Sequence, residues 1–253
     1  MASQRVGIGT DGPDYTLDVN GTLHANGVAL GVNPSWSGFQ ATIGGGGQNA
    51  TSASWATVAG GLQNSAAGQY TVVPGGHSNV ANGDYSYAAG RRAKANHLGS
   101  FVWGDATNAD VTSSVNNEFV LRASGGFTLY SDAGMTTGAQ LAAGSGSWAS
   151  LSDRDVKDNI RPVDGEEILR KISQLDISRW NYRTQNKSVE HIGPMAQDFY
   201  ELFEVGDNNT TITTIDPDGI SLAAIKALIE KNSNLENEIS ELKRLVKELI
   251  ESK

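Results

Sequence analysis

Small apolar side chains in the first half of the chain recur in step with glycines. The glycines lie 15, 15, 15 and 14 residues apart, at Gly45, Gly60, Gly75, Gly90 and Gly104. The apolar residues before them are Ile43, Val58, Val73, Ala88 and Val102. One such repeat cannot bury a core alone, so repeats must stack as rungs about 4.8 Å apart. The pattern predicts a β-roll with 15-residue rungs over residues 40–105.

Aromatic residues keep the same phase at Trp55, Tyr70 and Tyr85, with Phe101 close to the next position. A flexible glycine-rich linker is the alternative explanation for so much glycine, but a linker has no reason to hold an aromatic residue in register. The stacked rungs therefore predict an aromatic ladder along one edge of the roll.

The end of the chain changes to a heptad pattern from about Ile220. The a and d positions of the seam are Ile225, Leu228, Asn232, Leu235, Ile239, Leu242, Val246 and Leu249. Ile or Val at a, Leu at d and one Asn at a favour a two-stranded coiled coil. Ile229, Leu245 and Ile250 at e and g widen the apolar face, which suits a third helix. We side with three helices because the rest of the sequence also favours a trimer.

Between these regions the pattern predicts a small α+β unit. Asp164 and Glu167 form a capping pair before a helix whose apolar face continues to Leu175. Residues 177–182 alternate like a strand, and a second helix is expected around 199–203. Another strand is expected at 211–215, followed by a turn at 217–219.

Composition divides the chain near Leu151. Residues 1–151 hold 26 of the 30 glycines and 13 charged side chains, whereas residues 152–253 hold four glycines and 34 charged side chains. The net charge of −9 argues against binding to nucleic acid or to anionic membranes. There is no cysteine and no apolar run of membrane-spanning length. No cofactor and no metal site is expected, and Asp11, Asp14 and Asp18 lack EF-hand spacing.

The 15-residue rungs resemble the head repeats of trimeric autotransporter adhesins, which implies a trimeric, left-handed parallel β-roll. Those repeats usually have 14 residues, so the loops differ here. The N-terminal segments 6–10 and 17–21 resemble a short motif of phage tail-fibre proteins. A thin roll gains apolar contacts when it packs against two further copies.

Two motifs resemble the intramolecular chaperone domain of phage tail spikes and endosialidases. The first contains Ser152-Asp153, Lys157 and Asn159-Ile160, and the second covers residues 191–197, His-Ile-Gly-Pro-Met-Ala-Gln. This resemblance implies a domain that trimerises, brings the upstream fibre into register, and then cuts the Leu151–Ser152 bond. It assigns Ser152 as nucleophile and Lys157 as base, with His191 and Asp153 as possible supporting groups.

The chemistry sets a condition on the local structure. A serine hydroxyl needs a neighbouring base, and a lysine becomes one only where desolvation or nearby cations lower its pKa. Five residues along an ideal helix turn through about 500°, so if Ser152 and Lys157 act within one chain, residues 152–157 cannot form a continuous regular helix. The alternative is that Lys157 comes from a neighbouring subunit. The ordinary alternatives are an N-cap at Ser152-Asp153, a solvated Lys157 and a hydrogen-bonded strand residue at His191.

The predicted organisation has five segments, in a mainly β protein with an α+β C-terminal part. They are an attachment segment (1–39), the β-roll (40–105), a β-rich neck (106–151), the chaperone domain (152–219) and a trimeric coiled coil (220–253).

The leading functional hypothesis is a homotrimeric fibre protein of a phage tail or related particle, located in a virion or extracellular surface structure and made without a signal peptide. Its partners would be two further copies, with a cell-surface glycan or receptor and a tail or baseplate protein as candidates. Any catalysis would be a single-turnover self-cleavage. The alternatives are a bacterial surface adhesin without a phage role and, more remotely, a glycan-cleaving tail spike fragment.

Overall fold

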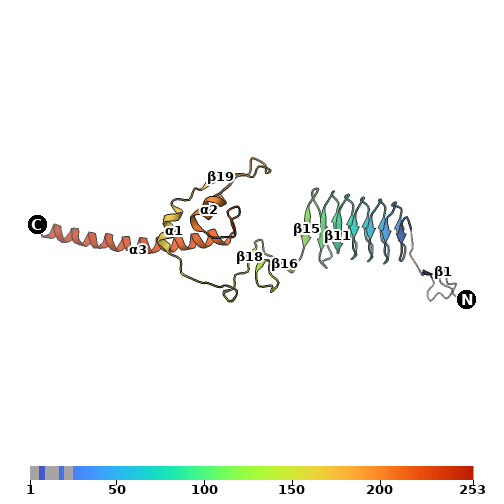
Figure 1. Cartoon of the computed structure of the whole chain (residues 1–253), viewed down its shortest axis with the longest axis horizontal. Helices are drawn as coiled ribbons and strands as arrows, with labels where there is room; N and C mark the ends of the chain where they lie inside the picture. Colours follow the sequence, from blue (N-terminus) through green and yellow to red (C-terminus); the bar gives the residue numbers. More distant parts are fainter. Residues whose placement is uncertain (1–5, 9–16, 20–24, 253) are drawn as a thin grey trace. The chain divides into compact units, whose positions relative to one another are not determined.

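The computed structural model describes residues 6–8, 17–19 and 25–252, and the chain divides into two compact units, Met1–Ala149 and Ser150–Lys253 (Figure 1). Asp11 and Asp14 lie outside the described residues. The first described elements, β1 (Val6–Ile8) and β2 (Leu17–Val19), form a parallel pair.

Most of the first unit is a β-solenoid made of two parallel sheets. The seven-stranded sheet contains β3 (Val28–Ala29), β5 (Thr42–Ile43), β7 (Thr57–Val58), β9 (Val72–Val73), β11 (Tyr87–Gly90), β13 (Phe101–Gly104) and β15 (Phe119–Arg122). The six-stranded sheet contains β4 (Ser35–Trp36), β6 (Ala50–Thr51), β8 (Ser65–Ala66), β10 (Val80–Ala81), β12 (Ala93–Ala95) and β14 (Val111–Thr112). The predicted stacking is confirmed, because Thr42 pairs with Thr57 and Thr57 with Val72.

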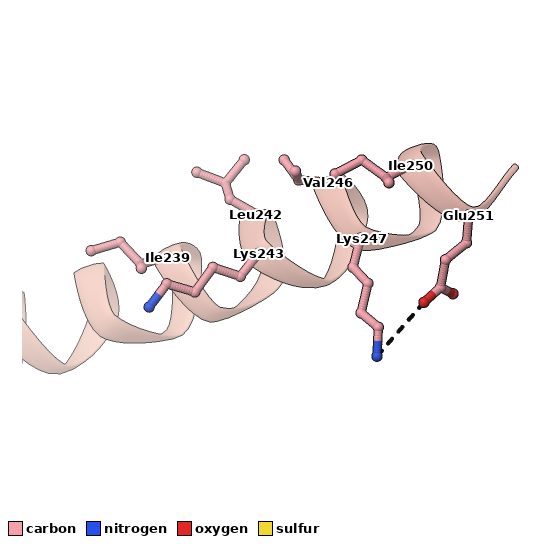
Figure 2. Close-up of a pocket in the computed structure, with 7 residues that line it drawn as sticks. All are labelled: Ile239, Leu242, Lys243, Val246, Lys247, Ile250 and Glu251. Carbon is pink, nitrogen blue, oxygen red and sulfur yellow. Dashed lines mark ion pairs between the residues drawn. The ribbon is translucent and has the colours of Figure 1, made fainter. Parts of the chain in front are cut away.

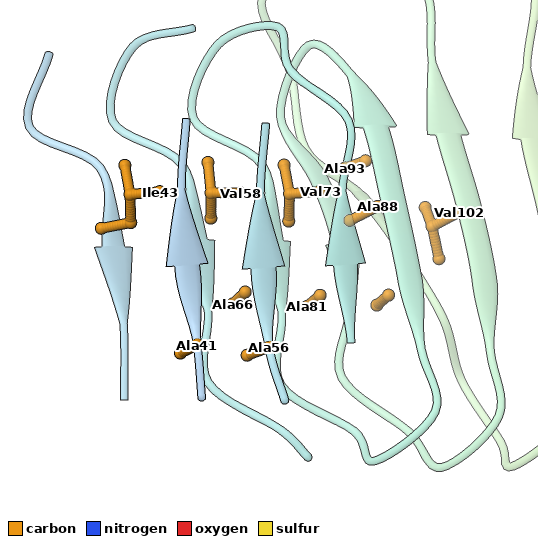
Figure 3. Close-up of a cluster of buried hydrophobic side chains, with 11 residues drawn as sticks. Ala41, Ile43, Ala56, Val58, Ala66, Val73, Ala81, Ala88, Ala93 and Val102 are labelled. Carbon is orange, nitrogen blue, oxygen red and sulfur yellow. The ribbon is translucent and has the colours of Figure 1, made fainter. Parts of the chain in front are cut away.

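The core of the solenoid is narrow. The row of fully buried side chains along one sheet is Ile43, Val58, Val73, Ala88 and Val102, so a rung contributes at most one medium-sized side chain to it (Figure 3). Alanines from the opposite sheet complete the core. A stack of this kind has no central layer of large side chains, so its stability depends on repeated hydrogen bonds as well as on apolar burial.

A buried column of asparagines runs beside this row, at Asn49, Asn64 and Asn79. The Asn64 amide nitrogen donates to the carbonyl oxygens of Gly60 and Gly76 at 2.9 and 3.0 Å, and its oxygen accepts from the Asn79 backbone N–H at 3.0 Å. Only a short amide side chain satisfies two carbonyls and the next rung at once. These asparagines lie 15 residues apart in the sequence, but that spacing does not by itself show that they are buried.

Replacing Asn64 with alanine should lower the free energy of unfolding by about 1–3 kcal/mol, because the buried Asn79 N–H loses its acceptor and the Gly60 and Gly76 carbonyl oxygens each lose a donor. Thermal or denaturant unfolding followed by circular dichroism measures this loss. Gln63 is the matched control, since its exposed side chain bonds only to neighbouring side chains. An equal effect of Gln63→Ala would contradict the stabilising role of the column.

Each rung has two turns, and between Gln48 and Tyr85 each turn holds one non-glycine residue in the left-handed backbone region. One column includes Gln48 and Gln63, and the other includes Trp55, Tyr70 and Tyr85, all with φ between 54° and 59°. The aromatic ladder is confirmed, with ring centroids 4.8 Å apart between Trp55 and Tyr70 and 4.9 Å apart between Tyr70 and Tyr85. This stacking compensates a conformation that is costly for bulky residues.

Phe101 does not join that ladder. It stacks between Tyr87 and Phe119 instead, at centroid distances of 4.5 and 4.6 Å. The reason is the shorter rung that ends at Gly104, which places Phe101 in a strand opposite Tyr87. Gly99 stands fourteen residues after Tyr85, and its φ of +65° continues the column of left-handed residues without a ring.

Polar contacts close the C-terminal end of the solenoid. Arg122 Nε donates to Asp105 Oδ1 at 2.9 Å, and the Ser124 backbone N–H donates to Asp105 Oδ2 at 2.7 Å. Hydrogen bonding from Ser124, first through its side chain and then through its backbone N–H, is the main reason that the pKa of Asp105 lies well below its usual range. Beyond this point, β16 (Gly126–Tyr130) pairs antiparallel with β17 (Gly138–Ala142), and β18 (Ala149–Ser150) is the third strand of that sheet.

The second unit is mixed α and β. It contains a 3₁₀ turn η1 (Arg154–Val156), α1 (Gly165–Ile172), the antiparallel pair β19 (Ser178–Trp180) and β20 (His191–Gly193), α2 (Ala196–Phe203) and the long helix α3 (Ile215–Glu251). The helices predicted after Asp164 and around 199–203 are confirmed. The Asp164 side chain caps α1 by accepting from the Glu166 and Glu167 backbone N–H groups at 3.0 and 3.2 Å.

The strand predicted at 211–215 and the turn predicted at 217–219 are wrong. Thr213 exchanges hydrogen bonds with Asp216 at the start of α3, so this threonine caps a helix rather than extending a strand. Pro217 falls in the first turn of α3, where its missing N–H would have no partner in the helix anyway.

Candidate functional site

Ser152 and Lys157 meet within one chain. The turn η1 lies between them, and the Lys157 backbone N–H bonds to Arg154 O at 3.2 Å as the turn ends. Lys157 then adopts an extended backbone, with φ −117° and ψ 132°, and its Nζ donates a hydrogen bond to Ser152 Oγ. The segment is not a regular helix, so it satisfies the condition that the five-residue spacing imposed.

The surroundings of this pair are open. Every residue from Ser152 to Ile160 is exposed in the single chain, whereas Leu151 is half-buried. Water therefore has free access to the Ser152 hydroxyl and to the Lys157 side chain. The contact between the predicted nucleophile and the predicted base is formed, and solvent surrounds it in the single chain.

The two supporting residues have other contacts. Asp153 caps η1, with its Oδ1 accepting from the Asp155 N–H at 3.0 Å. His191 lies in β20, where its Nε2 is 2.9 Å from Gln185 Oε1 and its ring lies 4.8 Å from that of Trp180. Within the described residues no hydrogen bond joins His191 to Ser152 or Lys157. The geometry gives both residues structural roles, and their catalytic roles stay predictions.

The second functional surface is the heptad seam of α3. Its seven apolar side chains are each between 47% and 65% exposed, and Asn232 is exposed among them. Over roughly the last three turns, Ile239, Leu242, Val246 and Ile250 line a shallow groove along the helix (Figure 2). No described residue of the unit covers this apolar stripe.

A different face of α3 builds the core of the unit. Ile220, Ala223 and Ala224 pack with residues of α1 and α2, including the buried Ile168, Phe199 and Phe203. On an ideal helix the centre of this packing face lies roughly 120° from the centre of the seam. The folded unit thus uses one side of the helix and leaves the seam free.

Close helix packing depends on small residues that the sequence reasoning missed. A Cβ on Gly165 would lie 2.7 Å from the Cβ of Ala227, so only glycine allows α1 to approach α3 this closely. The signal was present as alanines at 223 and 227, four residues apart on one face of the helix.

Ion pairs on α3 also avoid the seam. Arg244 contacts Glu241 at 2.5 Å and also pairs with Glu248, and Lys247 lies 3.8 Å from Glu251. These residues occupy the b, c and f positions of the heptads, which face away from a partner helix. The charged side is solvated, and the apolar side is left for association.

No group of three or more His, Cys, Asp or Glu side chains is placed to hold a metal ion in the part of the chain that the structure describes. None of its helices combines the length and apolar character needed to cross a bilayer.

Comparison with known families confirms the predicted resemblance of the second unit. Residues 152–206 match the family model of the chaperone of endosialidase. The match begins at Ser152, and it includes Lys157 and the second motif at 191–197. Together with the β-solenoid, it supports a role in the assembly of a fibre or spike.

Proposed function

We propose that this chain is a homotrimeric fibre protein whose C-terminal unit assembles three copies and then separates from them by self-cleavage. The observation that carries the proposal is the uncovered seam of α3, which lies opposite charged side chains and apart from the face that packs the unit. An apolar stripe of eight heptad positions is what parallel helices bury when they associate.

Three copies are favoured over two by the width of the stripe. Ile229, Leu245 and Ile250 flank the a and d positions and are 41% to 70% exposed. A two-stranded coiled coil leaves much of its e and g positions in water, whereas added helices cover more of that surface. The single Asn232 at an a position would fix the register at some cost in stability.

The proposed cut has a defined chemical course. Lys157, as a free amine, accepts the proton of Ser152 Oγ, and the oxygen attacks the carbonyl carbon of Leu151. Because oxygen and leaving nitrogen belong to the same residue, the attack closes a five-membered ring and its collapse shifts the acyl group from nitrogen to oxygen. Lys157 returns the proton to the nitrogen. Water then hydrolyses the ester, leaving a carboxylate on Leu151 and a free amine and hydroxyl on Ser152.

Assembly would control this reaction. Ser152 and Lys157 are already in contact but solvated, so burial by neighbouring copies is the step that favours the neutral amine. The scissile bond lies two residues beyond the Ala149–Ser150 boundary, so the cut would free the solenoid from the helical unit. The product would be a trimeric fibre segment of a virion or related surface particle.

Mass spectrometry of the expressed chain tests the cut. We expect two fragments that meet at the Leu151–Ser152 bond, in place of the 26.7 kDa species. A chain that stays whole while it forms a trimer would remove self-cleavage from the proposal and leave the assembly role standing.

A further inference from the structure

One outer face of the solenoid, here called the aromatic face, is uncharged and largely apolar. It consists of the outward side chains of the seven-stranded sheet. They are Thr42, Thr57, Val72, Tyr87, Phe101 and Phe119 in one column and Ala89, Trp103 and Leu121 in a second. Val72, Trp103 and Phe119 are 38%, 36% and 66% exposed. Exposed apolar side chains that form a continuous patch mark a contact surface more often than scattered ones do.

The opposite sheet has a different outer face. Its outward residues include Ala50, Ser65, Val80 and Lys94, and none of these is aromatic. The Lys94 ammonium bonds to the Ser78 carbonyl oxygen at 2.6 Å. The solenoid is therefore two-sided, and the aromatic face is the one that gains more by leaving water.

The spacing of the aromatic face restricts its partner. Tyr87, Phe101 and Phe119 stack at 4.5 and 4.6 Å with interplanar angles of 5° and 22°, so they cover each other's ring faces and present ring edges outward. These edges repeat with the rungs. A surface with this period and no charge is best matched by another stack of rungs with the same period.

A three-fold assembly also needs a second apolar surface, because its contacts are between different patches of neighbouring copies. The ladder of Trp55, Tyr70 and Tyr85 supplies one. Each of these rings lies two residues before a residue of the aromatic face, so the ladder borders it. The rings are 43%, 43% and 64% exposed.

We propose that the aromatic face is the surface through which each solenoid contacts another copy of this chain. The inference rests on the proposed homotrimer and names the face that the trimer buries in the first unit. The coiled coil would hold the copies parallel, and the aromatic face would align them rung against rung.

Labelling of single cysteines in the full chain tests the proposal, since the natural sequence has no cysteine. Val72→Cys places the thiol on the aromatic face, and Val80→Cys is the matched control on the opposite face. In one isolated chain Val72 is the more exposed of the two, so its thiol would react faster. Contact with a second copy reverses this order. We expect the thiol at 72 to react with a maleimide at least about tenfold more slowly than the thiol at 80.

Light scattering on the same samples measures the mass of the assembly, so it tests the proposed homotrimer separately from the proposed contact face. A trimer in which the thiol at 72 reacts as fast as the thiol at 80 overturns the assignment of the face and leaves the proposed function intact. A monomer overturns the proposed function itself. If Val72→Cys does not assemble, Thr57→Cys and Ser65→Cys repeat the comparison on the same two faces with half-buried side chains.

Discussion

A chain carrying Ser152→Ala is expected to stay whole at 26.7 kDa under conditions where the natural sequence is cut into two fragments. The alanine has no oxygen to attack the Leu151 carbonyl, and loss of a serine nucleophile slows catalysis by at least about 10⁴-fold. Mass spectrometry of freshly purified and aged samples measures the uncut fraction. Ser152 is exposed, so the variant should still assemble.

Three further variants identify the chemistry. Lys157→Arg keeps the charge and the length but cannot act as a base, so it should also stay whole. Ser150→Ala removes a nearby exposed hydroxyl and should be cut normally. Hydroxylamine added during cleavage should capture the ester as a hydroxamate on Leu151. Cutting of Ser152→Ala at the natural rate would show that another group performs the reaction.

Replacing Leu235 and Leu242 together with lysine should convert the trimer into monomers. Each substitution places one ammonium per chain in a buried layer of the seam, and a buried charge without a partner costs several kcal/mol. Sedimentation or light scattering measures the change in mass. Self-cleavage should fall with it, because the surface that desolvates Lys157 is lost.

The matched control is Asn234→Lys with Asn237→Lys, which adds the same charge to the c and f positions that face water. It should leave both the trimer and the cleavage intact. Equal disruption by the two pairs would mean that net charge, rather than burial of the seam, controls assembly.

Repetition made the solenoid predictable. A period of about 15 residues fixes the phase of Val58 or Tyr70 many times over, so one misread residue changes little. The exception was the 14-residue rung, where a single shift moved Phe101 from the edge ladder to a strand. The buried role of Asn64 was not predictable, because an asparagine that follows a glycine pair by a few residues is normally read as part of a turn.

The helical unit was less predictable where local and tertiary signals compete. Thr211 to Ile215 has the β-branched residues of a strand, yet Thr213 caps α3. The sequence suggested a contact between Ser152 and Lys157 only through the resemblance to the family motif. Their spacing excluded a regular helix between them, but it did not predict the turn that the structure contains. The roles of His191 and Asp153 depended on resemblance alone, and their observed contacts are with other residues.

Native mass spectrometry of the uncut Ser152→Ala chain tests the central claim most directly. The account predicts a single assembly of three times 26.7 kDa in dilute solution. A folded species of 26.7 kDa, or a dimer, would contradict it, because the exposed seam and the thin solenoid core would then be stable without three copies.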